Sequence, residues 1–71
     1  MTKKEEFLKG FDEDFQEVTV EVTVPNCPET ELIINPKANF AGKKTYYEKA
    51  YNDNLELNTF NQIKIVGFTF K

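Results

Sequence analysis

The clearest hydrophobic pattern in the chain is the alternation in EVTVEVTV, residues 17–24. Valine fills every even position from Val18 to Val24, and threonine or glutamate fills the odd positions. An alternation of period two in β-branched residues predicts a strand with one buried face and one wet face. Such a half-buried strand is typical of antiparallel sheets, and Pro25 ends it.

Three weaker patterns predict further strands. The apolar run Leu32–Ile34 follows a turn region, residues 25–30, that holds two prolines and an asparagine, so we expect the return strand of a hairpin. Residues 55–57, Leu-Glu-Leu, alternate and predict a third short strand. Residues 58–61 then form the connection to a fourth strand, Ile63–Phe70.

The fourth strand changes parity near Gly67. Ile63 and Ile65 point to one face of a regular strand, and the apolar side chains from Val66 onward point to the other. A β-bulge near Val66–Gly67 would insert one residue and return both sets to the same face. The alternative is a central strand covered on both faces, with the phenylalanine-rich N-terminus as the second cover.

The segment from Asn35 to Asp53 predicts the main helix. Asn35 suits the N-cap, and Pro36 suits the first helical position, where its missing N–H costs nothing. An apolar stripe then recurs at helical spacing, while the far side of the helix is polar. Asparagine and aspartate at residues 52–54 end the helix. The stripe consists of Phe40, Tyr47, Ala50 and Tyr51, with Tyr46 at its flank.

Residues 1–16 carry a second helical stripe, which Gly10 and an acidic run interrupt. One interpretation is a short helix or arm that packs on the chain's own sheet. The other is an arm that packs on a partner or on a second copy, because an apolar stripe framed by acids suits both roles. The stripe consists of Phe7, Leu8, Phe11 and Phe15.

Together these elements predict an α+β fold. We expect a small, mostly antiparallel sheet of three or four strands packed on one main helix, in the order β-β-α-β-β. Residues 1–16 form an N-terminal amphipathic arm or short helix, and residues 17–71 form a single α+β domain. A chain of 71 residues buries a modest core, so self-association would add stability, although a stable monomer is the alternative.

The composition leaves little material for catalysis. The chain has no histidine, no serine and one cysteine, which excludes a histidine general base, a serine nucleophile and an intramolecular disulfide. Cys27 lies near Glu29 and Glu31, whose negative charge opposes a reactive thiolate. A zinc site lacks its usual ligands, and no nucleotide-binding motif is present. We therefore expect a protein that is not an enzyme, with no catalytic residue, cofactor or metal.

Charge is divided unevenly along the chain. Residues 1–34 hold three lysines and nine acidic residues, whereas residues 35–71 hold six lysines and three acidic residues. The absence of arginine makes the chain poorly suited to duplex DNA. The acidic half, with Glu17 and Glu21 on the wet face of the first strand, either solubilises the protein or imitates nucleic acid in a basic groove of a host enzyme. No apolar run is long enough to span a bilayer, and the acidic N-terminus is unlike a signal peptide, so we expect a cytoplasmic protein.

Aromatic and lysine residues form the remaining candidate binding groups. Lys43 falls within the aromatic stripe, where it either extends along the edge of the core or joins a patch that grips an anionic ligand or acidic partner. The tyrosines of this patch would be Tyr46, Tyr47 and Tyr51. A rival function is single-stranded nucleic-acid binding, with aromatic rings as stacking faces and the C-terminal lysines along the phosphates. The candidate stacking rings are Tyr46, Tyr47, Phe60, Phe68 and Phe70.

The stretch IINPKANFAGKKTYYEKAYNDNL, followed by IKIVGF, resembles small uncharacterised proteins encoded in phages and prophages of low-GC Gram-positive bacteria. The resemblance covers about residues 30–70 and rests on Asn35-Pro36, Tyr46-Tyr47, Ala50–Asp53 and Ile63–Val66. It carries no catalytic motif and implies a small accessory protein, made during infection or lysogeny, that binds host or phage proteins. We therefore expect a non-enzymatic protein-interaction module that binds a protein partner or forms a homodimer. Its surface would be the phenylalanine stripe, an exposed strand edge, or both.

Overall fold

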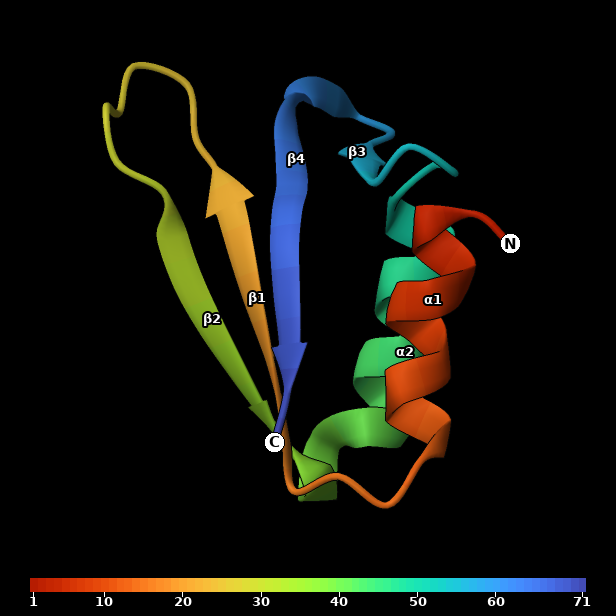
Figure 1. Ribbon diagram of the computed structural model, residues 1–71. Helices are drawn as coiled ribbons and strands as arrows, with labels where there is room; N and C mark the ends of the chain where they lie inside the picture. The colour runs from red at the N-terminus through yellow and green to blue at the C-terminus, as the bar shows by residue number, and fades with distance from the viewer.

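The valine-rich strand β1 (Glu17–Thr23) lies inside a four-stranded antiparallel sheet of order β2-β1-β4-β3. The computed structural model describes residues 1–71 and adds β2 (Glu31–Pro36), β3 (Glu56–Leu57) and β4 (Phe60–Phe70) to this sheet (Figure 1). The main helix lies between β2 and β3 along the chain, so the predicted α+β class and the order β-β-α-β-β are confirmed.

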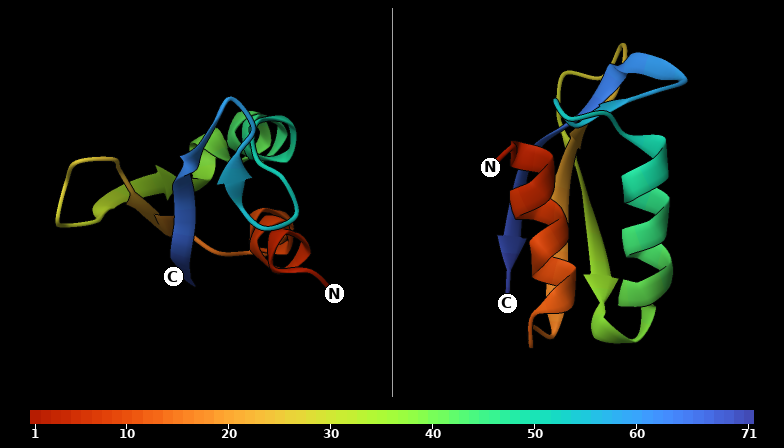
Figure 2. Two further views of the ribbon diagram at one scale, coloured as in Figure 1. Left: turned by 90° about the horizontal axis from the view of Figure 1, so that it is seen from above. Right: turned by 90° about the vertical axis from the view of Figure 1, so that its right-hand side faces the viewer.

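Two helices cover one face of this sheet. α1 (Lys3–Lys9) continues into a 3-10 turn, η1 (Gly10–Asp12), and α2 (Phe40–Ala50) follows another, η2 (Lys37–Asn39). Figure 2 shows α1 and α2 side by side in front of the strands, with no helix over the opposite face. Both helices are too short and too polar to cross a bilayer. The molecule therefore has two layers, and one side of the sheet faces outward.

The hydrophobic core fills the space between the helices and the valine face of β1. Val18, Val20 and Phe7 are fully buried, and Leu55 is 1 % exposed. The predicted alternation in β1 is confirmed for Val18, Val20 and Val22, whereas Val24 lies beyond the strand and outside the core. Of the predicted helical stripe, Phe40 and Tyr47 of α2 are buried in this core, and Tyr51 joins them from the position after the helix. The core consists of Phe7, Phe11, Val18, Val20, Val22, Phe40, Tyr47, Tyr51, Leu55 and Ile65.

The last strand contains the β-bulge that its change of parity predicts. Neighbouring residues of β1 pair with Ile65 and Gly67, which leaves Val66 as the inserted residue. The bulge brings Phe68 and Phe70 to the same helix-covered face as Ile65, while Val66 is 50 % exposed. β4 also begins earlier than predicted, because its first residues pair with β3 instead of forming a connection.

The prediction that Asn35 and Pro36 begin the helix is wrong. Asn35 is 1 % exposed and lies in β2, where its Nδ2 donates hydrogen bonds to the backbone oxygen of Val18 (3.2 Å) and to Tyr47 Oη (3.4 Å). These two contacts hold the side chain against the core, so it does not reach an amide of the helix. Pro36 is the last residue of β2 and precedes η2.

The main helix is therefore shorter than the predicted range Asn35–Asp53. It begins only after η2, and Tyr51 leaves it to form an isolated β-bridge with the last residue of β3. The side-chain oxygen of Asn52 then accepts hydrogen bonds from the backbone amides of Asn54 (2.9 Å) and Glu56 (3.0 Å). The polar residues after the helix thus form a turn, as their residue types predict.

Residues 1–16 pack into the same core as the rest of the chain. A capping box between Thr2 and Glu5 begins α1. Lys4 Nζ donates hydrogen bonds of 2.7 Å to two backbone oxygens at the C-terminal end of α2. Because a cation there satisfies carbonyls that have no helical partner, this contact ties α1 to α2. The structure shows the first of the two interpretations, a short helix that packs on the chain's own sheet.

Candidate functional site

The face of the sheet opposite the helices, called the open face below, is exposed and partly apolar. Residues at odd positions of β1 point to it, and so do their cross-strand partners in β2 and β4. Its three aliphatic side chains are strongly exposed, Leu32 by 68 %, Ile34 by 61 % and Val66 by 50 %. The open face consists of Glu17, Thr19, Glu21, Thr23, Leu32, Ile34, Pro36, Lys64, Val66, Gly67 and Thr69.

β2 forms one edge of the sheet, and its outer side has no neighbouring strand. Glu17 of β1 exchanges backbone hydrogen bonds with Lys71, which follows β4. Because successive residues of a strand direct their backbone groups to opposite sides, the even-numbered residues of β1 form their backbone hydrogen bonds with β2. Their partners are the odd-numbered residues of β2, and Leu32 and Ile34 therefore direct their N–H and C=O groups away from the sheet. Leu32 and Ile34 thus combine strongly exposed aliphatic side chains with unpaired backbone groups.

The predicted arm residues do not form a surface of their own. Phe7 and Phe11 are 0 % and 6 % exposed, and their rings meet edge-on with centroids 5.3 Å apart. Leu8 and Phe15 are half-buried against the core, and the Phe15 ring stacks on Phe70 at 5.0 Å. In this fold these side chains belong to the core and its margin, and they offer little area to a partner.

The predicted lysine–tyrosine patch reaches the surface only at Lys43 and Tyr46. Lys43 Nζ lies 5.6 Å from the centroid of the half-exposed Tyr46 ring, in a cation–π arrangement. Tyr47 and Tyr51 are 3 % and 5 % exposed, and burial raises the pKa of both hydroxyls, that of Tyr51 to about 12. An anionic ligand would therefore meet one lysine and one ring here.

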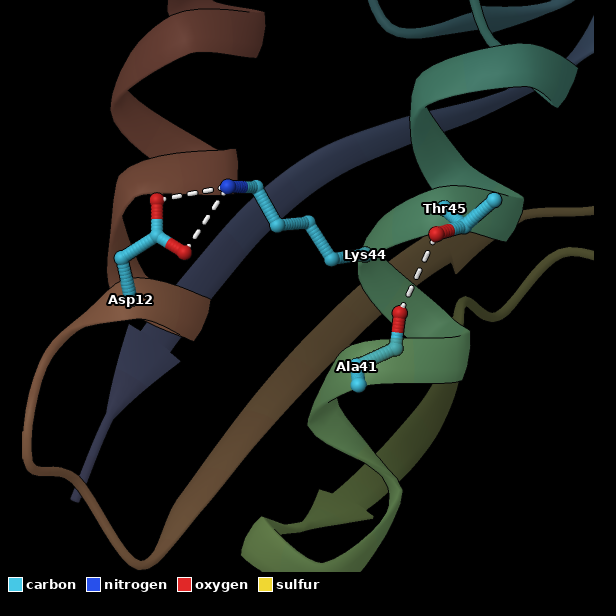
Figure 3. Close-up of polar contacts among 4 residues, drawn as sticks. All are labelled: Asp12, Ala41, Lys44 and Thr45. Atoms are coloured by element: carbon cyan, nitrogen blue, oxygen red, sulfur yellow. Dashed lines mark hydrogen bonds and ion pairs between the residues drawn. The ribbon is translucent and has the colours of Figure 1, made fainter.

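A surface groove of about 520 Å³ lies between η1 and α2. Lys44 Nζ contacts both carboxylate oxygens of Asp12 across it, at 2.6 and 2.8 Å (Figure 3). Lys37 pairs with Asp14, and this hydrogen bond and the lysine charge hold the pKa of the Asp14 carboxyl below its usual value. Both lysines that line the groove are thus already paired with carboxylates, so we assign no anionic ligand to it.

The candidate stacking rings are divided between the surface and the core. Tyr46 and Phe60 are 49 % and 45 % exposed, and they lie on separate elements, α2 and the start of β4. Phe68 and Phe70 pack against the core, where the Phe68 centroid lies 5.2 Å from that of Phe7. The rings therefore do not form a continuous platform.

The charged side chains of the open face have both signs. Glu21 is half-buried and accepts a hydrogen bond from Thr30 Oγ1 at 2.5 Å, and Lys64 lies on the same face. Cys27 is exposed in the turn between β1 and β2. No three histidine, cysteine, aspartate or glutamate side chains gather closely enough to hold a metal ion. The geometry thus brings together an apolar edge, threonines and charged side chains of both signs.

Sequence reasoning named an exposed strand edge as a candidate surface but did not identify Leu32 and Ile34 as its residues. A usable signal was present, because the run Leu32–Ile34 has no alternation and must place aliphatic side chains on both faces of its strand. The run does not say whether its strand lies at the edge of the sheet, since strand order depends on long-range pairing.

Comparisons with protein-family models, with curated proteins and with solved structures find no match to this chain. What the chain does must therefore be inferred from its own residues and their geometry.

Proposed function

We propose that this chain is a non-enzymatic protein-interaction module that binds its partner through the β2 edge. The observation that carries the proposal is the coincidence of two properties in Leu32 and Ile34. Their side chains are 68 % and 61 % exposed, and their backbone groups face the unpaired side of β2. A strand added along this edge would gain main-chain hydrogen bonds and an apolar contact at the same residues.

The composition of β2 supports this role, because natural sheets usually protect their edges. Lysine, proline, bulges or short length keep most edge strands from pairing with other chains. β2 has six residues, with Glu31 at its start and Pro36 at its end, and the four residues between them carry no charge. Burying apolar surface contributes about 25 cal/mol per Å². Covering Leu32 and Ile34 would therefore offset part of the cost of ordering a partner strand.

The resemblance to small phage and prophage proteins supports a setting for this module. In that setting the chain is a phage-encoded accessory protein that acts in the cytoplasm of the host cell by binding host or phage proteins. Strand addition suits such a role, since main-chain hydrogen bonds give affinity and side chains on alternate positions give specificity.

The other functions that the sequence suggests have less support. Stacking of several nucleobases needs exposed rings along one groove, whereas Tyr46 and Phe60 lie on separate elements. A mimic of nucleic acid needs a field of one sign, whereas Lys64 shares the open face with Glu21.

Site-specific photo-crosslinking tests the proposal. A photoreactive phenylalanine analogue at Ile34 reports on the β2 edge, and the same analogue at Thr45, which is exposed on α2, is the matched control. In lysates of Gram-positive cells, with and without phage infection, we expect a specific adduct at position 34 only, with another protein or with a second copy. An absent adduct at position 34, or the same adducts at both positions, would contradict the proposal.

Binding must then be mapped with the purified components. When the captured protein is titrated into the ¹⁵N-labelled chain, the backbone amide signals of Leu32 and Ile34 should shift most. Shifts that concentrate on α1 or α2 instead would show that the β2 edge is not the contact.

A further inference from the structure

We infer that the partner at the β2 edge is a second copy of this chain, paired antiparallel along β2 about a two-fold axis. This inference rests on the proposed function, because it names the occupant of the same edge. The pairing joins the two sheets into one continuous sheet, with the helices of both copies on the same side.

One register pairs the outward N–H and C=O groups of both Leu32 and Ile34 in each copy. In it, Leu32 of one copy lies opposite Ile34 of the other, and each such pair exchanges both of its N–H···O=C hydrogen bonds. The two-fold axis repeats this pair, so the contact is the same for both copies. A shift in one direction places Leu32 opposite Pro36, which has no N–H to donate. A shift in the other direction places Ile34 opposite Thr30, which lies outside β2, so one of the two aliphatic residues loses its strand partner.

The same register gathers the exposed aliphatic side chains. Residues that lie opposite one another in adjacent strands share a face of the sheet, so Leu32 and Ile34 of both copies form one cluster on the joined open face. Ile33, which is 39 % exposed, meets its own counterpart on the helix-covered side. The pairing therefore covers every large apolar residue of β2.

Charge complementarity favours the antiparallel direction. Glu29 precedes β2, Glu31 begins it, and Lys37 follows its end. In an antiparallel pair the acidic start of one strand runs beside the end of the other, where Lys37 also pairs with Asp14 of its own copy, and the two acidic starts stay apart. A parallel pair would align like charges, which destabilises cross-strand neighbours.

Edge pairing is also favoured over packing two open faces against each other. A face-to-face contact would bury Glu21 and Lys64, and burial of charged groups costs free energy unless each finds a partner. Edge pairing leaves both side chains in water and still covers Leu32 and Ile34.

Sedimentation velocity over a concentration series, from about 1 µM to about 1 mM, tests self-association directly. One strand from each copy makes a small interface, so we expect a weak dimer with a dissociation constant on the order of 10–100 µM. A chain that stays monomeric throughout this range would overturn the inference.

A proline substitution tests whether the β2 edge makes the contact. Ile34→Pro removes an N–H that faces outward and none that bonds β1, so the variant should fold and dimerise at least about tenfold more weakly. Val66→Lys is the matched control, because Val66 lies on the open face but on β4, and it should leave the dimer unchanged. If Val66→Lys abolishes the dimer and Ile34→Pro does not, the copies pack face to face and the edge assignment is wrong.

A cysteine crosslink tests the register. In a Cys27→Ala background, Ile33→Cys should oxidise rapidly to a disulfide dimer, because opposite residues of a non-hydrogen-bonded pair have Cα atoms about 4.5 Å apart. Val66→Cys in the same background should crosslink much more slowly. Equal rates would contradict the register.

The outcomes separate this inference from the proposed function. If the chain is monomeric but the photoreactive group at Ile34 captures a different protein, the second copy is ruled out and the interaction module stands. If the chain is monomeric and Ile34 captures nothing, both are overturned.

Discussion

The helix-covered face and the open face of the sheet carry aliphatic side chains of similar size in very different surroundings. Val18 and Val20 are fully buried under the helices, whereas Leu32 and Ile34 are more than half exposed. Burying such a side chain contributes about 1.5–3 kcal/mol. The covered face therefore supplies most of the folding free energy, and the aliphatic side chains of the open face are free to contribute to association instead.

The two edges of the sheet repeat this contrast. β3 has two residues and a register shift within them, which are features that limit pairing with another chain. β2 has six residues, and three exposed aliphatic side chains lie in its middle. Substitutions in the core should therefore change stability, and substitutions at the β2 edge should change association.

The largest expected effect is on the covered face. Phe7→Ala should lower the free energy of unfolding by about 3–5 kcal/mol, because it leaves a cavity at a fully buried ring. A domain of this size is stable by only about 4–10 kcal/mol, so little stability would remain. Chemical denaturation measures the loss. Phe60→Ala is the control, because its ring is 45 % exposed, and it should lower the free energy of unfolding much less. Equal losses of stability in the two variants would contradict the division between core and surface.

Alkaline pH should weaken the same core through Tyr51. Burial raises the pKa of its hydroxyl to about 12, above the value of about 10 in the unfolded chain. The neutral phenol is therefore favoured by folding, and its contribution is fully present below about pH 10 and is lost as the pH rises through about 12. Between about pH 10 and about pH 12, the free energy of unfolding should fall less steeply with pH in Tyr51→Phe than in the native chain. Parallel pH profiles would show that the Tyr51 hydroxyl is not protected by the fold.

A pair of glycine substitutions separates packed from open positions on the helices. A Cβ at Gly10 would lie 2.1 Å from a ring carbon of Phe70, whereas a Cβ at Gly42 has no neighbour within 4 Å. Gly10→Ala should therefore destabilise the fold by about 1–3 kcal/mol. Gly42→Ala should stabilise it by about 0.5–1 kcal/mol, because alanine favours the helix. The melting temperatures of the two variants should shift in opposite directions. Melting temperatures that shift in the same direction would contradict the packing of η1 against β4.

Patterns that depend on one element could be predicted from the sequence. The alternation in residues 17–24 needs only one buried face, so the strand followed directly. The parity change near Gly67 left a bulge and a strand covered on both faces as alternatives, and the pairing of β4 with β1 shows the bulge. The helix start at Asn35 could not be predicted in this way. Its residue types favour a cap, but hydrogen bonds to Val18 and Tyr47, which are distant in the sequence, hold Asn35 in β2.

The candidate site depends on contacts that the sequence does not specify. The stripe of Phe7 and Phe11 has the same spacing whether it covers the chain's own sheet or a partner, and only the tertiary structure shows that it covers the sheet. The exposure of Leu32 and Ile34 depends on the strand order β2-β1-β4-β3, which places their strand at the edge. That order results from pairing between distant segments and not from any local pattern.

The most direct test of the division between folding and association is to measure both properties in Ile34→Pro. Its free energy of unfolding should be determined at about 1 µM, where a weak dimer has dissociated and does not add to stability, and its mass should be followed up to about 1 mM. The account predicts an unfolding free energy within about 0.5 kcal/mol of the native chain and a monomer at concentrations where the native chain is a dimer. A variant that loses several kcal/mol of stability, or that dimerises as the native chain does, would contradict it.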